Sequence, residues 1–102
     1  MYLIEKTRVF DKWLRKLKDK KAKARILIRI QRIEESGNFG DFKSVGEGIF
    51  ELRIHYAKGY RVYYTEKKGR LVLLLVGGDK STQNRDIEKA KEIWSVHRND
   101  NN

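Results

Sequence analysis

The sequence predicts an α+β fold in which three helices pack on a twisted antiparallel sheet, in the order β-α-α-β-β-β-α. Two observations carry this prediction. Between residues 7 and 37 the apolar residues recur every three or four positions, which is typical of amphipathic helices. After Gly37 they recur every second position or run on continuously, as in strands, until a last helical pattern begins near Ser81.

The first half of the chain begins with a short β-prone segment at residues 2–4. Thr7 can cap the helix that follows, because its hydroxyl can accept a hydrogen bond from an otherwise unpaired backbone N–H. The apolar stripe of this helix consists of Phe10, Trp13, Leu14 and Leu17. The polar residues 19–21 separate it from a second helix, which Gly37 is well placed to end. The stripe of the second helix consists of Ala22, Ile26, Ile30 and Ile33.

The second half predicts three strands, at residues 50–55, 60–65 and 71–76, after a glycine-rich loop at residues 38–48. Short turns at residues 58–59 and 67–69 join them. Ser81 or Thr82 can cap the last helix. We expect apolar helix stripes to cover one face of the sheet. The alternation of side chains along the strands then places four polar or aromatic residues on the opposite face: Arg53, His55, Arg61 and Tyr63.

Length and composition restrict the organisation of the chain. The 102 residues fit one domain, expected at residues 1–98, with a disordered Asn-rich tail at residues 99–102. Cysteine is absent, which excludes disulfides, thiolate metal sites and a cysteine nucleophile. No apolar run approaches the roughly 20 residues that span a bilayer. Because charged residues interrupt the first ten positions, no signal peptide is expected, and the predicted location is the cytoplasm without membrane contact.

The charge indicates the kind of partner. Lys and Arg number 24 against 14 acidic residues, a formal net charge of +10, with the excess concentrated in residues 1–35. A small domain with this charge is attracted to polyanions such as nucleic acid, the ribosome or an acidic protein. The alternative is a solvated lysine-rich surface without a partner. No residues have the spacing of a zinc site, and residues 77–81 lack the spacing of a phosphate-binding loop.

Several short motifs, taken in order, resemble one known family. They are Trp13-Leu14, residues 37–41 (GNFGD), 46–53 (GEGIFELR), 59–64 (GYRVYY), 74–83 (LLVGGDKSTQ) and 86–90 (DIEKA). Together they resemble the addiction-module killer branch of the RelE/ParE superfamily, close to the HigB-type toxins, over roughly residues 6–94. The resemblance implies a RelE-like fold with two N-terminal helices and a C-terminal helix on a twisted antiparallel sheet.

The same resemblance implies function and partners. It implies a type II toxin that an antitoxin neutralises, often a HigA-like antitoxin with a helix-turn-helix, so that operator DNA is contacted only through the antitoxin. The RelE and HigB branches imply cleavage of mRNA in the ribosomal A site, without metal or other cofactor. The ParE branch implies inhibition of DNA gyrase instead. A relic that only binds its antitoxin is the third hypothesis.

RNA cleavage without a metal requires stabilisation of a negatively charged phosphorane, and arginine suits this because it stays charged and binds two phosphate oxygens at once. Arg61 matches the family's phosphate-stabilising arginine, although pairing with Glu51 on the neighbouring strand is the alternative. Arg53 and Lys80 match basic positions of the same site. A surface salt bridge is the alternative for Arg53.

Proton transfer is assigned less directly. His55 has the reference pKa of a general acid or base, whereas no tyrosine follows Tyr64, where RelE-like members often carry one, and His97 lies near the chain end. Tyr63 could stack on a base or pack in the core. The basic helical surface of residues 12–32 could grip RNA or be merely solvated. Within it the candidate RNA-binding residues are Lys12, Arg15, Lys16 and Arg29.

Overall fold

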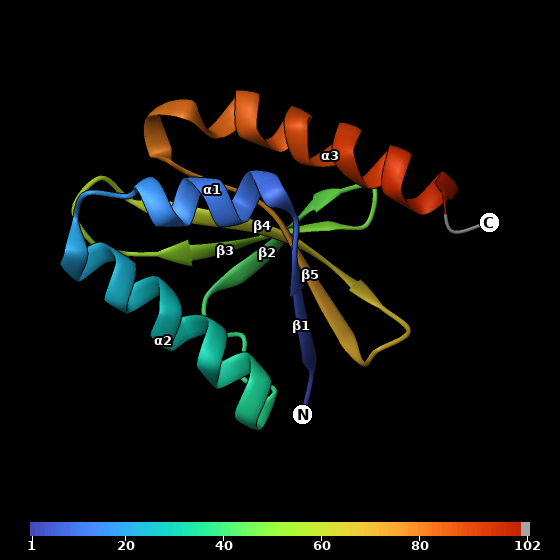
Figure 1. The fold of residues 1–102 in the computed structure, drawn as a ribbon, viewed down its shortest axis with the longest axis horizontal. Coiled ribbons are helices and arrows are strands. Elements are labelled where there is room, and N and C mark those ends of the chain that lie inside the picture. Colours follow the sequence, from blue (N-terminus) through green and yellow to red (C-terminus); the bar gives the residue numbers. More distant parts are fainter. Residues whose placement is uncertain (101–102) are drawn as a thin grey trace.

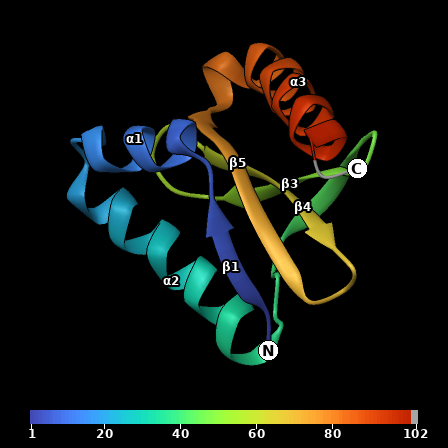
Figure 2. The ribbon, with the colours of Figure 1, turned by 45° about the vertical axis from the view of Figure 1, so that its right-hand side comes forward.

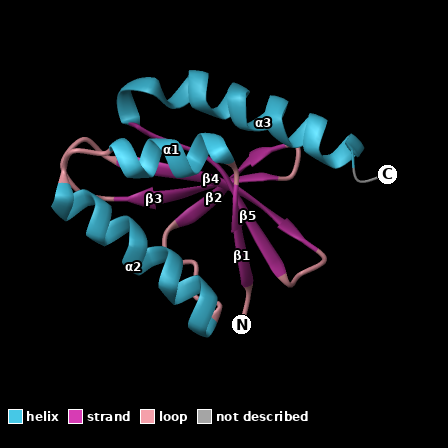
Figure 3. Ribbon diagram, in the orientation of Figure 1, coloured by secondary structure: helices cyan, strands magenta, loops and turns pink. Residues whose placement is uncertain are grey.

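A five-stranded sheet forms the centre of the molecule, and helices pack against it on both sides (Figure 1, Figure 3). The computed structural model describes residues 1–100. Its elements are β1 (Leu3–Lys6), α1 (Arg8–Lys16), α2 (Lys20–Ser36), β2 (Phe42–Gly46), β3 (Ile49–Ile54), β4 (Tyr60–Lys67), β5 (Leu71–Asp79), the 3-10 turn η1 (Lys80–Thr82) and α3 (Gln83–Asp100). The predicted α+β class and the predicted helices are confirmed.

The helix boundaries follow from their capping residues. The Thr7 hydroxyl accepts from the Phe10 N–H at 3.0 Å, and the Asp19 carboxylate accepts from the Ala22 N–H at 3.0 Å. Gly37, with φ of 73°, ends α2 in the left-handed conformation that glycine adopts most easily. Asp79 caps η1 by accepting from the Ser81 N–H at 2.8 Å, so the turn into α3 begins before the predicted caps at Ser81 and Thr82.

The sheet has the order β1-β5-β4-β3-β2, and it contains one strand more than the sequence predicted. Residues 42–46, expected in a loop, form β2 and pair antiparallel with β3, with a register shift between Ser44 and Gly46. The strand escaped prediction because most of its side chains are exposed and it shows no apolar alternation. β1 pairs parallel with β5, because the two helices between β1 and the rest of the sheet remove the constraint that a hairpin imposes.

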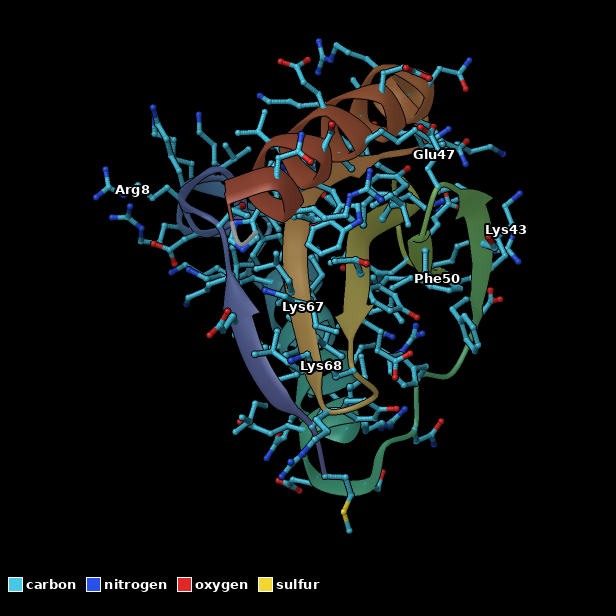
Figure 4. The ribbon with its side chains drawn as sticks, turned by 90° about the vertical axis from the view of Figure 1, so that its right-hand side faces the viewer. Arg8, Lys43, Glu47, Phe50, Lys67 and Lys68 are labelled. Carbon is cyan, nitrogen blue, oxygen red and sulfur yellow. The ribbon has the colours of Figure 1, made fainter. Side chains whose placement is uncertain are left out.

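The helices divide between the two faces of the sheet. The stripes of α1 and α2 pack with one set of buried strand residues, including Leu52, Val62 and Tyr64. α3 packs on the other face, over Ile49, Tyr63 and Leu75. Figure 4 looks onto this second face and shows α3 crossing the upper part of the sheet, with Lys67 and Lys68 at the uncovered lower end. The turned ribbon of Figure 2 shows the same division, with α3 apart from α1 and α2.

The expectation of an open face bearing Arg53, His55, Arg61 and Tyr63 was therefore wrong in part. That face also carries Ile49, Leu73 and Leu75, and such apolar side chains are stable only under a covering element. α3 supplies the cover over Tyr63, which is completely buried, and Arg61 is almost completely buried as well. His55 stays exposed, because it lies beyond the end of β3.

The C-terminal helix is longer than predicted. α3 continues to Asp100 and includes the first two residues of the tail expected at residues 99–102, whereas residues 101 and 102 lie outside the described part. Within residues 1–100, no helix is long and apolar enough to cross a membrane.

The contact between α1 and β5 gives a test of the packing. A Cβ atom at Gly77 would lie 2.2 Å from the Trp13 ring, so only glycine allows this ring to lie flat on the strand. Gly77→Ala should therefore lower the free energy of unfolding by about 1–3 kcal/mol, measured by urea denaturation.

The same clash predicts that the two residues are coupled. Trp13→Leu makes room at this contact, so the double variant should lose less stability than the sum of the two single variants. Strict additivity would show that Gly77→Ala acts through something other than the Trp13 ring.

Candidate functional site

Four basic side chains meet in one pocket at the end of the sheet where β3 turns into β4. Tyr60 at the start of β4 pairs with Asp79 at the end of β5, so the β3–β4 turn and η1 lie side by side. The pocket has a volume of 420 Å³. Its lining residues are His55, Tyr56, Ala57, Lys58, Gly59, Arg61 and Lys80. The structure thus brings together three of the four predicted catalytic residues and adds Lys58.

Arg61 is the most firmly held of these cations. The residue is 8% exposed, and its Nη1 donates to the carbonyls of Gly59 at 2.9 Å and Tyr60 at 3.3 Å. Gly59 has φ of 72°, and a Cβ there would lie 3.3 Å from Nη1, so glycine lets the turn close over the guanidinium. The guanidinium therefore enters the pocket in a fixed orientation.

A buried carboxylate lies behind the Arg61 guanidinium. Glu51 is fully buried, and its Oε1 lies 3.8 Å from the Arg61 Nε. Its Oε2 accepts from the Tyr63 hydroxyl at 3.0 Å and from the Gln83 amide at 2.6 Å. Burial, and then the nearby Glu51 charge, raises the pKa of Tyr63 far above its ordinary value, so this phenol remains a hydrogen-bond donor. Tyr63 is not available for the predicted stacking on RNA, because α3 covers it.

A second charged cluster lies beside the pocket. Asp41, in the segment before β2, accepts from the Arg53 guanidinium at 3.1 Å and is hydrogen-bonded to the His55 ring. The hydrogen bond from His55, followed by that from Arg53, holds the pKa of Asp41 below its ordinary value. Arg53 is opposite Arg61 in the ladder but lies outside the pocket lining, so its first role is to bind Asp41. The His55 nitrogen bonded to Asp41 is Nε2. In the tautomer that carries its proton on Nε2, Nδ1 is the ring nitrogen that can accept a proton.

The predicted RNA-binding residues are placed in three different settings. Lys12 and Lys16 line a groove of 1010 Å³ between α1 and the start of α3. Arg15 instead points to Asp11, with Nε 3.1 Å from the carboxylate. Arg29 donates to the backbone carbonyls of Arg53, Phe39 and Asp41, and so holds the segment before β2 against the sheet. This guanidinium is committed to the fold and not to an RNA surface.

The groove and the pocket are continuous. Ala57 and Lys58 line both, and the groove adds four further cations beyond Lys12 and Lys16: Lys18, Lys58, Arg85 and Lys89. Asp86 forms part of its floor, where it accepts from the Thr82 hydroxyl at 2.6 Å. Asp86 also fills the space above Gly78, since a Cβ there would lie 1.9 Å from its Oδ2. The chain thus forms one continuous basic surface from α1 to the Arg61 pocket.

Metal ligands are not grouped in this region. Among the side chains of residues 1–99, no cluster of three or more His, Cys, Asp or Glu residues is suited to hold a metal ion.

From the sequence, Glu51 was identified only as a possible ion-pair partner of Arg61, and Gln83, Asp41 and Lys58 were not predicted as residues of the site. The position of Glu51 could have been predicted from the sequence, because residues 51 and 53 are two apart on one strand and therefore point to the same face of the sheet. No sequence pattern predicts the contact of Gln83 with Glu51, because it depends on where α3 packs on the sheet.

The chain is similar to one protein family, to a bacterial relative and to solved toxin structures. The family described as "Phage derived protein Gp49-like (DUF891)" matches residues 12–95. A protein of Haemophilus influenzae (strain Rd), named only as uncharacterized, is 59% identical over 88 residues, which cover 86% of this chain and 88% of that protein. Two solved structures have the same fold. A chain of the intact E. coli RelBE toxin–antitoxin complex matches with a TM-score of 0.65 at 18% identity, over 78% of this chain and 96% of that one. The isolated E. coli RelE toxin matches with a TM-score of 0.64 at 16% identity, over 87% and 98%.

The Asp41 cluster predicts a dependence of stability on pH. Because folding lowers the pKa of Asp41, its ionised form stabilises the native state above the unfolded-state pKa, and this contribution is lost as the pH falls through the folded-state pKa. Asp41→Asn should be less stable than the wild type at about pH 5, and the difference should shrink toward about pH 2.

Urea denaturation across this pH range checks the expectation. Glu88→Gln, which removes an exposed carboxylate on α3, is the control and should show a small difference throughout. A stability gap for Asp41→Asn that stays constant with pH would mean that the charge of Asp41 plays no part.

Proposed function

The chain belongs to the phage-derived Gp49-like family, and from this membership, the RelE fold and the basic pocket we propose that it is a type II toxin that cleaves mRNA on the ribosome. The observation that carries the proposal is the gathering of Arg61, Lys80, His55 and Lys58 around one pocket. The motifs quoted from the sequence favour the HigB-type branch. Cleavage on the ribosome implies that the protein acts in the cytoplasm.

The proposed reaction is an internal transesterification. The 2′-oxygen loses its proton and attacks the adjacent phosphorus, the bond to the 5′-oxygen breaks, and that oxygen takes up a proton. The products are a 2′,3′-cyclic phosphate and a 5′-hydroxyl. Negative charge accumulates on the phosphorane, and fixed cations lower the barrier most when they are already oriented toward it.

The pocket residues have distinct parts in this proposal. Arg61 donates to the phosphorane oxygens from a fixed position, and Lys80 and Lys58 add positive charge from the two neighbouring turns. His55 carries a proton to or from the reacting oxygens, with Asp41 orienting its ring. Arg53 supports this arrangement through Asp41 and stays outside the reacting group.

The basic groove is proposed to hold the RNA on one side of the cleaved bond. Lys12 and Lys16 face it from α1, and Lys89 and Arg85 face it from α3. Flexible lysines suit this part, because phosphate contacts give affinity without requiring a fixed geometry.

The partners follow from the same proposal. The fold also occurs in a chain of the RelBE toxin–antitoxin complex, which supports an antitoxin partner here. We propose a HigA-like antitoxin with a helix-turn-helix, through which alone the complex contacts operator DNA. The ribosome and its mRNA are the proposed target.

Induced expression in bacteria tests this function, with mapping of mRNA 5′ ends for the wild type beside Arg61→Lys. The lysine keeps a counterion for Glu51, so the fold is retained, whereas Arg61→Ala would leave a buried carboxylate unpaired. We expect new 5′ ends at ribosome-occupied codons, reduced about 100-fold in the variant. Intact mRNA with DNA damage would favour gyrase as the target, and normal growth would indicate a relic.

The groove predicts a salt-dependent affinity for RNA. Lys12→Ala/Lys16→Ala should weaken binding of a single-stranded oligonucleotide and flatten the slope of log K against log salt by about 1.4, for two lost phosphate contacts. Fluorescence anisotropy measures both. Lys20→Ala/Lys21→Ala, on the exposed start of α2, should leave the slope unchanged, and an equal effect of both pairs would argue against a defined groove.

A further inference from the structure

We propose that Glu51 is a positioning residue that fixes Arg61 and the Lys80-bearing turn relative to one another, a role that rests on the function proposed above. Glu51 does not line the pocket and is fully buried. Its carboxylate nevertheless contacts the two structural units that carry the cations. The proposal assigns the orientation of the site to this one buried charge.

The burial of Glu51 is costly and therefore informative. An ionised carboxylate removed from water is stable only when charged or hydrogen-bonding groups compensate it. Two neutral donors, from Tyr63 on β4 and Gln83 on α3, bind the same oxygen, Oε2. Because neutral donors leave the carboxylate's full charge in place, the other oxygen, Oε1, attracts the Arg61 guanidinium.

The contact on the Arg61 side sets the direction of the guanidinium. Among the side chains of residues 1–99, neither Glu51 Oε1 nor Arg61 Nε has a hydrogen-bond partner, and the two atoms lie 3.8 Å apart. Their attraction is therefore electrostatic, and it turns the Nε edge of the guanidinium toward the protein interior. Since Nη1 donates to the Gly59 and Tyr60 carbonyls, Nη2 is the nitrogen left to approach a phosphate in the pocket.

The contact on the Lys80 side fixes the turn η1 at both ends. Asp79, before the turn, pairs with Tyr60 in the sheet and caps the turn through Ser81. Gln83, after the turn, donates to Glu51 at 2.6 Å. Lys80 therefore stands between two anchored residues, and the second anchor is the carboxylate that also orients Arg61.

The charge of Glu51 separates this role from a purely structural one. A glutamine at residue 51 keeps the shape and can still accept from Tyr63, so activity would be retained if Glu51 only packed in the core. Activity would fall if Glu51 orients Arg61, because a neutral amide does not attract the guanidinium as a carboxylate does. Misplacement of a reacting group by about 1 Å can lower a rate by about 100-fold.

The first experiment compares wild type with Glu51→Gln in mRNA cleavage on reconstituted translating ribosomes. Thermal unfolding establishes that each variant is folded. We expect kcat to fall about 100-fold with KM changed by less than about twofold, because the groove that binds RNA is untouched. Glu35→Gln, which removes an exposed carboxylate on α2, is the matched control and should cleave like the wild type.

Gln83→Ala keeps the proposal testable if Glu51→Gln does not fold. It removes the tie to η1 without changing the buried charge, and we expect kcat to fall about tenfold. Gln31→Ala is its control, since Gln31 donates to Glu35 on the exposed surface of α2. Wild-type kcat in Glu51→Gln, or in Gln83→Ala where that is the folded variant, would overturn the proposal.

The second experiment does not depend on cleavage. The Arg61 Nε–H resonance, assigned with Arg61→Lys, is followed by NMR while inorganic phosphate is added. Phosphate should shift this resonance in the wild type, and Glu51→Gln should need at least about tenfold more phosphate for the same shift. If the wild type cleaves no RNA, the proposed function fails, and this titration alone decides the role of Glu51. Equal titrations in both proteins would overturn that role, even if kcat had fallen.

Discussion

The buried carboxylate of Glu51 is the constraint on which the rest of the structure depends. Breaking a buried ion pair by removing one partner costs about 3–5 kcal/mol, so the chain must bring compensating groups to it in any stable fold. They come from β4 and from α3, two elements that β5 and the turn η1 separate in the sequence. α3 can therefore dock on the sheet in few positions, because a shift along its axis would withdraw Gln83. An apolar interface alone would allow such slippage more easily.

The docking of α3 in turn creates both parts of the basic surface. The groove forms where the start of α3 faces α1, and the pocket forms where η1 meets the β3–β4 turn. Glycines let both helices approach β5 closely, since Gly77 lies against the Trp13 ring of α1 and Gly78 against Asp86 of α3. Gly77 and Gly78 at the end of β5 thus form a contact surface for the two helices. Their lack of side chains matters as much for the site as the cation Lys80 that follows them.

The sequence was sufficient for the parts of the fold that local chemistry determines. The caps at Thr7 and Gly37 and the apolar stripe of α1 are features of neighbouring residues, and they were predicted correctly. The placement of α3 depends on long-range packing, so the open face was predicted wrongly although Leu73 and Leu75 already required a cover. In the site, the alternation of side chains along the strands correctly placed Arg61 and Arg53 on the same face of the sheet. It cannot predict the long-range contacts of Asp41 with Arg53 and of Gln83 with Glu51.

The cations of this surface differ in how firmly they are held, and the difference bears on what each can do. Arg61 is buried and bound by two carbonyls and a carboxylate, so little entropy is lost when it meets a charged group. Lys12 and Lys16 are exposed and flexible, and a lysine that must be ordered on binding gives up much of its Coulomb energy. A cation held in one place can stabilise the charge of a transition state more than that of the ground state, because it lies where the charge develops. A flexible cation moves with the phosphate and stabilises both states equally. In the proposed reaction, rate enhancement is therefore expected from the residues that Glu51 orients, and RNA affinity from the lysines along the groove.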